Sequence, residues 1–263
     1  MINEIIAKSK KILIKIGSNT LSDSEGHVNK EILQNIGEQI HHLIKLDKQV
    51  VIVSSGAKIA GIAAINKWRR KEDMHYKQAL CAIGQVELMN AYQDVFRGFD
   101  LHIGQMLLTR DDFNEQNRTL NMRNTIFTLI DEGVIPIVNE NDTVSVEELR
   151  IGDNDTLAAL TASLWNADLM VMMSDIDGVY NKNPKTFKDA KLIEKIDHIE
   201  DLMATIDMQG TSDFGTGGIA TKIEAAKRVK EYGIPMILTN GKKKDILKKL
   251  LQNEEKATLF RAR

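Results

Sequence analysis

Short apolar runs rich in β-branched residues recur along this chain, and helical spacing separates them. Residues 11–17 and 49–53 are two such runs, and the segment 29–47 between them carries apolar residues at helical spacing. A strand, a helix and a second strand in that order require a crossover connection, which predicts a parallel strand pair. Similar runs follow later in the chain, at 101–109, 135–138, 168–174 and 234–239. The sequence therefore predicts an α/β fold with a mainly parallel central sheet.

The most polar of these strand ends lies in the stretch 135–155. Four acid or amide residues follow the apolar run directly: Asn139, Glu140, Asn141 and Asp142. A second cluster, Asp153, Asn154 and Asp155, comes after Gly152. Such residues also form ordinary turns, so composition alone does not decide. At a strand end, the two clusters predict one pocket, suited either to a small zwitterion or to a hydrated Mg²⁺.

Two further strand ends carry residues suited to anions. Gly17 permits close backbone approach to an anion, and Lys15 could bring an ammonium group beside a phosphate, although lysines flanking strands are usually solvated. After the run at 49–53, the small residues 54–57 begin a helix, whose free N–H groups can bind an anion. Ser54 and Ser55 would equally serve as helix caps, and the two roles are compatible.

A glycine-rich loop at 215–222 needs separate treatment. It satisfies the loose dinucleotide-binding pattern, but no buried strand precedes it, so we reject a nicotinamide site. A Walker-type loop is also absent, because Lys222 lies four residues after Gly218. What remains is a glycine loop opening a helix, from which Thr216 and Lys222 could reach nucleotide phosphates.

Composition excludes several classes of protein. The 263 residues are 43% apolar and carry a net charge of −2, which gives no electrostatic footprint for nucleic acid. The one cysteine, Cys81, excludes an internal disulfide framework. No secretory signal is evident, and no apolar run approaches the roughly 18 residues of a membrane span. We expect a cytoplasmic protein with no nucleic-acid or membrane partner.

Seven segments taken together resemble the amino acid kinase family, and within it the members that phosphorylate glutamate. They are KIGSNTL at 15–21, VVIVSSGA at 50–57, GQMLLT at 104–109, PIVNENDTV at 136–144, IGDNDTLAAL at 151–160, SDIDGVY at 174–180 and GTGGIATK at 215–222. The resemblance covers essentially the whole chain. It implies a single domain, 1–263, built as a three-layer αβα sandwich, with glutamate bound by about 1–165 and ATP by about 166–263.

The resemblance also implies roles for individual residues. Lys15 and Lys222 would contact the transferring phosphoryl group, and Asp155 would organise both ammonium groups. Ser55, Asp142 and Asn154 would bind glutamate. The ATP-binding positions would be Lys15, Ser174, Asp175, Thr216, Gly217, Gly218, Ile219, Ala220, Thr221 and Lys222. No side chain is assigned to a metal, and Mg²⁺ would accompany ATP.

Further properties are implied only by the resemblance. The product would be an acyl phosphate, glutamyl 5-phosphate, passed to a reductase as the first step of proline biosynthesis. Free proline would be a feedback inhibitor, and the protein would form a homo-oligomer. Many members carry a PUA module of roughly 100 residues after the kinase domain, whereas this sequence stops at Arg263.

Three alternatives remain open from the residues. A sister kinase could act on acetylglutamate or a nucleoside monophosphate, although the acidic Asp142 favours a substrate with a free ammonium group. A non-catalytic sensor of nucleotide or amino acid is disfavoured by the presence of Lys15, Asp155 and Lys222 together. Nucleic-acid binding would depend on the lysines at 242–249, which are expected to form a solvated helix face.

Overall fold

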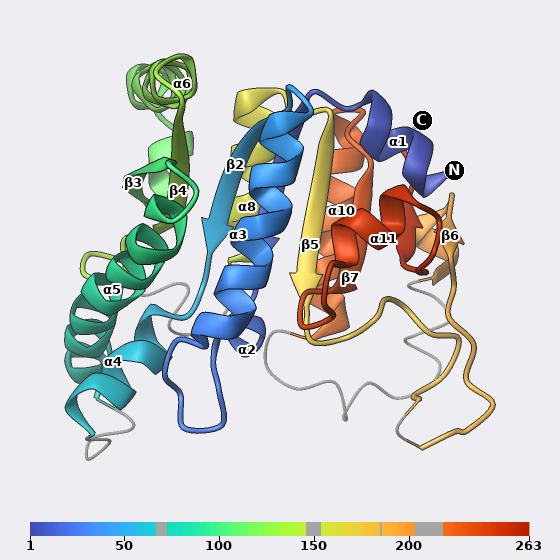
Figure 1. Cartoon of the computed structure of the whole chain (residues 1–263), viewed down its shortest axis with the longest axis horizontal. Coiled ribbons are helices and arrows are strands. Elements are labelled where there is room, and N and C mark those ends of the chain that lie inside the picture. Colours follow the sequence, from blue (N-terminus) through green and yellow to red (C-terminus); the bar gives the residue numbers. More distant parts are fainter. Residues whose placement is uncertain (67–72, 146–153, 185, 203–217, 263) are drawn as a thin grey trace.

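The computed structural model describes residues 1–66, 73–145, 154–184, 186–202 and 218–262, which form one sheet covered by helices on both faces (Figure 1). The sheet order is β3-β4-β2-β1-β5-β7-β8-β6. All neighbouring strands are parallel except β7 and β8, which are antiparallel. The strands are β1 (Lys11–Ile16), β2 (Gln49–Ser54), β3 (His102–Leu108), β4 (Val134–Glu140), β5 (Leu169–Ser174), β6 (Lys195–Ile196), β7 (Met236–Asn240) and β8 (Thr258–Phe260).

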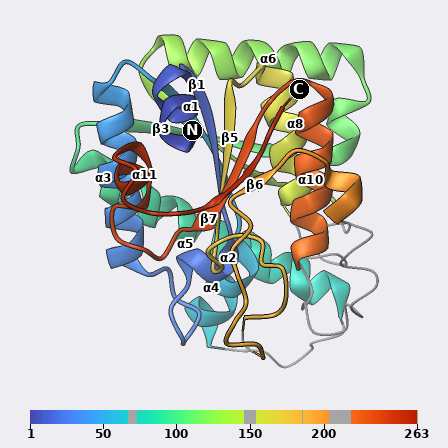
Figure 2. The same cartoon turned by 90° about the vertical axis from the view of Figure 1, so that its right-hand side faces the viewer.

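The helices form the two outer layers, which Figure 2 shows on either side of the edge-on sheet. The described helices are α1 (Ile2–Lys8), α2 (Ser18–Leu21), α3 (Lys30–Lys45), α4 (Ala57–Ile65), α5 (Met74–Arg97), the 3₁₀ turn η1 (Arg110–Phe113), α6 (Gln116–Asp131), α8 (Asp155–Trp165), α10 (Ile219–Glu231) and α11 (Ile246–Leu251). Apolar residues of α1, α3, α5 and α11 pack on one face of the sheet. Those of α6, α8 and α10 pack on the other. In the described part of the chain, no helix combines the length and apolar character that crossing a membrane requires.

The alternation of side chains along β1 decides where its lysine goes. Ile12, Ile14 and Ile16 join the apolar cluster on the α3 and α5 face. Leu13 joins the opposite cluster, beneath α8 and α10. Since side chains two residues apart share a face of a strand, Lys15 lies on the same face as Leu13. The alternation of side chains along β1 thereby directs the Lys15 ammonium group toward α8 and α10.

The parallel central strands all have their carboxyl ends on the same side of the molecule. From β1 the chain moves to β2 on one side, and it later returns to β5 on the other side of β1. Such a reversal of strand order opens a crevice at the carboxyl ends of the strands, where α/β proteins bind ligands. The three-layer αβα architecture that the sequence predicted is confirmed.

Some predicted boundaries were wrong. Residues 66–77 are rich in charged side chains, a composition that predicts an exposed loop, but α5 already begins at Met74, where Asp73 caps it by accepting from the Tyr76 N–H. The basic helix expected over 242–249 begins only at Ile246. Lys243 precedes this helix and is not simply solvated, because its Nζ contacts Asp177 Oδ1 at 3.1 Å and Glu255 Oε1 at 3.5 Å.

Candidate active site

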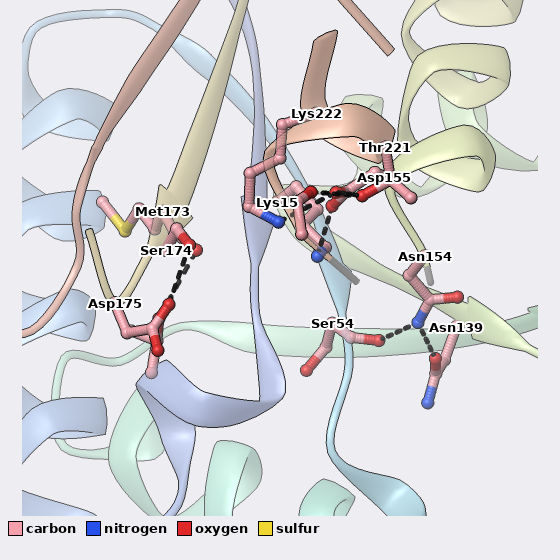
Figure 3. A network of polar contacts seen from close by, with 12 residues as sticks. Lys15, Ser54, Asn139, Asn154, Asp155, Met173, Ser174, Asp175, Thr221 and Lys222 are labelled. Carbon is pink, nitrogen blue, oxygen red and sulfur yellow. Dashed lines mark hydrogen bonds and ion pairs between the residues drawn. The ribbon is translucent and has the colours of Figure 1, made fainter. Parts of the chain in front are cut away.

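Two lysines from distant parts of the chain converge on one aspartate. Lys15 Nζ lies 2.5 Å from Asp155 Oδ1, and Lys222 Nζ lies 3.1 Å from Asp155 Oδ2, as Figure 3 shows. Lys15 comes from the end of β1, Asp155 from the first turn of α8 and Lys222 from α10. The structure thus brings together the three residues that the family resemblance places at the transferring phosphoryl group.

This ionic cluster is buried. Asp155 has no exposed surface, and Lys15 and Lys222 are 5% and 8% exposed. Burying charges is costly unless they are paired, so the contacts with the shared carboxylate stabilise both ammonium groups. The two ammonium groups and one carboxylate together carry one excess positive charge, which suits an anion bound beside them.

Thr221 adds a hydroxyl group to the same carboxylate. Its Oγ1 lies 3.0 Å from Asp155 Oδ2 and 2.9 Å from the Gly218 carbonyl oxygen. Since a hydroxyl group donates one proton, it serves one of these acceptors at a time. Gly218 caps the N-terminus of α10, where Ile219 and Ala220 form the first turn. Thr216 and Gly217, which the sequence assigned to ATP binding, lie outside the described residues.

A chain of amide groups links the two polar clusters of the 135–155 stretch. Asn154 Nδ2 donates to Asn139 Oδ1 at 2.6 Å and to the Ser54 carbonyl oxygen at 2.9 Å (Figure 3). Asn139 Nδ2 in turn donates to Gln85 Oε1 at 2.7 Å. The predicted meeting of the two clusters is therefore present for Asn139 and Asn154, while Asp153 lies outside the described residues.

Asp142 lies in this region as a buried acid, 7% exposed. Burial raises its pKa to about 6, against a hydrogen bond from the Cys81 thiol and the nearby Lys58 ammonium, which both lower it. Such a carboxylate gains from a cationic ligand, because an opposite charge would offset part of its desolvation.

The remaining predicted residues sit at neighbouring strand ends. Ser55 follows β2, and its backbone N–H donates to the Ile16 carbonyl oxygen at 3.0 Å, which ties it to the end of β1. Ser174 ends β5, and its hydroxyl donates to Asp175 Oδ1 at 3.1 Å. Partial burial alone would raise the pKa of Asp175, but hydrogen bonds from its own backbone N–H, Asn19 and Ser174 lower it, so this carboxyl group stays ionised.

Sequence reasoning missed one member of the site, Gln85. It lies in α5 among buried helix positions that include Cys81, Gly84 and Leu88. A polar residue on the buried face of a helix could have indicated a polar partner or a binding site, because buried polar groups need hydrogen-bond partners. The partner itself, Asn139, is 54 residues away and could not be read from spacing.

Known proteins resemble this chain in sequence. A model described as "Amino acid kinase family" matches residues 10–240. The chain is 64% identical to glutamate 5-kinase of Alkaliphilus metalliredigens (strain QYMF), covering 100% of this chain and 99% of that one. It is 61% identical to glutamate 5-kinase of Alkaliphilus oremlandii (strain OhILAs), with 99% of each covered. The match to glutamate 5-kinase of Geobacter sulfurreducens is 43% identical and covers 97% of this chain but 69% of that protein.

Solved structures share the fold at low sequence identity. UMP kinase from Ureaplasma parvum superposes with a TM-score of 0.66 at 18% identity, covering 97% of this chain and 99% of that one. An isopentenyl phosphate kinase superposes with a TM-score of 0.64 at 16% identity, covering 95% and 99%. These two likenesses concern the fold alone.

Proposed function

This chain belongs to the amino acid kinase family, and on that premise we propose that it transfers the γ-phosphoryl group of ATP to the γ-carboxylate of L-glutamate. The observation that carries the proposal is the convergence of Lys15 and Lys222 on Asp155. The proposal is also supported by the 64% and 61% sequence identity of this chain to two proteins named glutamate 5-kinase.

The reaction needs little covalent help from the protein. A γ-carboxylate oxygen forms a bond to the γ-phosphorus while the bond from phosphorus to the bridging oxygen breaks, and ADP leaves. The acceptor is already an anion, so no base has to remove a proton. The obstacle is repulsion between two anions. Lys15 and Lys222 would offset it by holding positive charge against the oxygens of the transferring group.

Asp155 would act on the lysines rather than on the substrate. Its two oxygens bind the two ammonium groups separately. This holds both groups in place before any ligand arrives, so that little reorganisation is needed during transfer. The Thr221 hydroxyl would restrict the same carboxylate further.

The two ends of the substrate would be held by different elements. Asp142 would bind the α-ammonium group of glutamate, and Asn154 and Ser55 would complete its site within residues 1–165. Ser174, Asp175 and the beginning of α10 would bind ATP within residues 166–263, together with Thr216 and Gly217. One continuous sheet runs through both halves and would hold them in register.

Mg²⁺ is proposed as the companion of ATP. Magnesium usually keeps several waters and binds through phosphates and one or two carboxylates. In the described ranges, no three or more His, Cys, Asp or Glu side chains gather as a metal site. The oxygens of Asp155 are already turned to ammonium groups, so we assign Mg²⁺ to the nucleotide and to no side chain. When bound, it would add positive charge against the phosphates.

The family resemblance supports three wider proposals. The product, glutamyl 5-phosphate, would pass to a reductase in proline biosynthesis. Free proline would inhibit at the glutamate pocket, and the chain would act as a homo-oligomer.

The test is ADP release by the purified protein with ATP, Mg²⁺ and glutamate, run with and without hydroxylamine. Hydroxylamine converts an acyl phosphate into a hydroxamate, so the expected result is glutamate-dependent ADP release with matching hydroxamate. Acetylglutamate and UMP serve as competing acceptors, since each fits a sister kinase. Phosphorylation of either in preference to glutamate would overturn the substrate assignment, and no ADP release with any acceptor would favour a sensor.

A further inference from the structure

Helix α5 contributes a polar face to the amino acid pocket. Cys81 and Gln85 are four residues apart in α5, which places them on one side of the helix. The Cys81 thiol hydrogen-bonds to Asp142, and Gln85 Oε1 accepts from Asn139. One helix therefore contacts both ends of the first polar cluster, Asn139 at the end of β4 and Asp142 just after it.

Close backbone contact fixes the position of α5 against α4. A Cβ atom on Gly84 would lie 1.8 Å from the Ala57 carbonyl oxygen, and one on Gly61 would lie 1.9 Å from the Leu80 carbonyl oxygen. The two helices can approach this closely only because both positions are glycine. Since α4 begins directly after Ser55 and Gly56, Gln85 is held at a fixed place relative to the predicted glutamate-binding residue Ser55.

Two backbone groups fix the direction of the amide chain. The Glu140 N–H donates to Asn139 Oδ1 at 2.9 Å, so the Asn139 amide nitrogen must face Gln85. The Ser54 carbonyl oxygen accepts from Asn154 at 2.9 Å, so the amide nitrogen of Asn154 must face Ser54 and Asn139. Because backbone groups cannot exchange donor for acceptor, the direction of every side chain between them follows.

Three buried atoms are left over by this arrangement. Within the described part of the chain, Gln85 Nε2, Asn154 Oδ1 and Asp142 Oδ1 have no hydrogen-bond partner. Their residues are 8%, 1% and 7% exposed. A buried polar atom without a partner is costly, which points to a ligand that completes the set. The one donor, Gln85 Nε2, suits a carboxylate on the ligand, and the two acceptors suit an ammonium group.

We propose that Gln85 determines specificity for the amino acid substrate by donating a hydrogen bond from Nε2 to its α-carboxylate. The proposal rests on glutamate being the substrate. Asn154 Oδ1 and Asp142 Oδ1 accept from the α-ammonium group. The α-carboxylate shares a carbon with that ammonium group, whereas the γ-carboxylate has to reach Lys15 and Lys222. Gln85 lies one helical turn from Cys81, which contacts Asp142, and is therefore on the α-carbon side of the pocket.

The test compares Gln85→Glu and Gln85→Met with the unmodified protein. Gln85→Glu retains an acceptor for Asn139 but replaces the donor with a negative charge. We expect its Kd for glutamate to rise about 10- to 100-fold, since a hydrogen bond to a charged group is lost. Its Kd for glutamate α-amide should rise far less, because that carboxamide can donate to the introduced carboxylate. Gln85→Met should shift the ratio of the two Kd values in the same direction by a smaller factor.

Calorimetric titration of both ligands gives the decisive ratio, and thermal unfolding establishes that each variant is folded. Gln93→Glu is the matched control, because Gln93 lies on the exposed side of the same helix. Unchanged glutamate binding in Gln85→Glu would show that Gln85 only orients Asn139. Equal losses for the two ligands in both variants would reduce Gln85 to a structural role. If the unmodified protein itself fails to bind glutamate, the proposed function falls, and this inference falls with it.

Discussion

The two ends of the candidate site are built on different physical principles. At the proposed phosphoryl end, Lys15 and Lys222 are cations that bind the shared carboxylate of Asp155. At the proposed amino acid end, Gln85, Asn139 and Asn154 are neutral amides in a directed chain, and among the described residues Gln85 Nε2 and Asn154 Oδ1 find no hydrogen-bond partner. The charges of the phosphoryl end are therefore assembled without substrate, whereas the hydrogen bonds of the amino acid end would be completed by the substrate.

The difference separates rate from recognition. Charges that are already assembled stabilise the transition state and therefore raise kcat. Polar atoms that lack a partner favour binding of a ligand of matching polarity and therefore affect affinity. Two consecutive residues at the start of α8 belong to different ends of the site. Asn154 turns to the amide chain, and Asp155 turns to the lysines. Substitutions on either side should therefore have separable effects.

Asp155→Asn should produce the largest effect. It retains the size of the side chain but removes the negative charge that both buried ammonium groups contact. We expect kcat to fall at least about 1,000-fold, beyond the loss of a single oriented group. The free energy of unfolding should fall by about 3 to 5 kcal/mol, because a buried pair has been broken. Steady-state kinetics and chemical denaturation measure the two effects.

A surface aspartate provides the control for this change. Asp189 pairs with Lys182 at 2.6 Å, but its side chain is 72% exposed. Asp189→Asn should change stability far less than Asp155→Asn does and leave kcat intact, because solvent screens an exposed ion pair. Comparable losses in the two variants would mean that the buried cluster has no special role.

Lys15→Ala and Lys222→Ala should come next. Each removes one positive group from the phosphoryl end, so kcat should fall about 100- to 1,000-fold while the KM for glutamate changes much less. Lys227→Ala, in the same helix as Lys222 but exposed, is the matched control. Unchanged kcat in both active-site variants would refute the assignment of the lysines.

The sequence predicted the phosphoryl end better than the amino acid end for a physical reason. Lys15 lies near the end of a strand whose apolar residues are buried on both faces, so its position at the carboxyl end of the sheet could be inferred from a local pattern. Asp155 and Lys222 each lie near the beginning of a helix, which is also a local feature. Their convergence was implied by the family resemblance and is visible in the structure.

Gln85 and the start of α5 depend on information that is not local. The charged residues at 69–73 resemble an exposed loop, and they concealed the capping residue Asp73. The helical spacing of Gln85 does not reveal its partner, because Asn139 lies at the end of a strand 54 residues further along the chain. The contact between Gly84 and Ala57 depends on the packing of two helices, which spacing along one helix cannot reveal.

Asp142→Asn should have an intermediate effect on activity, through glutamate binding rather than through kcat. Removing the negative charge should raise the Kd for glutamate about 10- to 100-fold, since a charge-assisted hydrogen bond is lost, with kcat little changed. Isothermal titration with glutamate checks the affinity. Wild-type affinity in this variant would remove Asp142 from the pocket, and a loss confined to kcat would contradict the separation of the two ends.

The smallest effect is a pH dependence that belongs to the amino acid end. Because burial raises the pKa of Asp142 to about 6, its carboxyl group becomes protonated below that pH and loses its attraction for ammonium. The kcat/KM for glutamate should therefore fall by up to about tenfold per pH unit below pH 6, and Asp142→Asn should lack this limb. A limb that persists in Asp142→Asn would belong to another group.

Stability should change with pH in the opposite sense. A raised pKa means that the ionised carboxyl group opposes folding, so the penalty is complete above about pH 6 and absent below pH 3.8. Asp142→Asn should therefore stabilise the ligand-free protein at pH 7.5 by about 1 to 3 kcal/mol, and the gain should vanish toward pH 4. Chemical denaturation at both pH values measures it. A gain together with weaker glutamate binding would identify Asp142 as a residue retained for recognition at a cost in stability, and a loss of stability would show that the fold needs its charge.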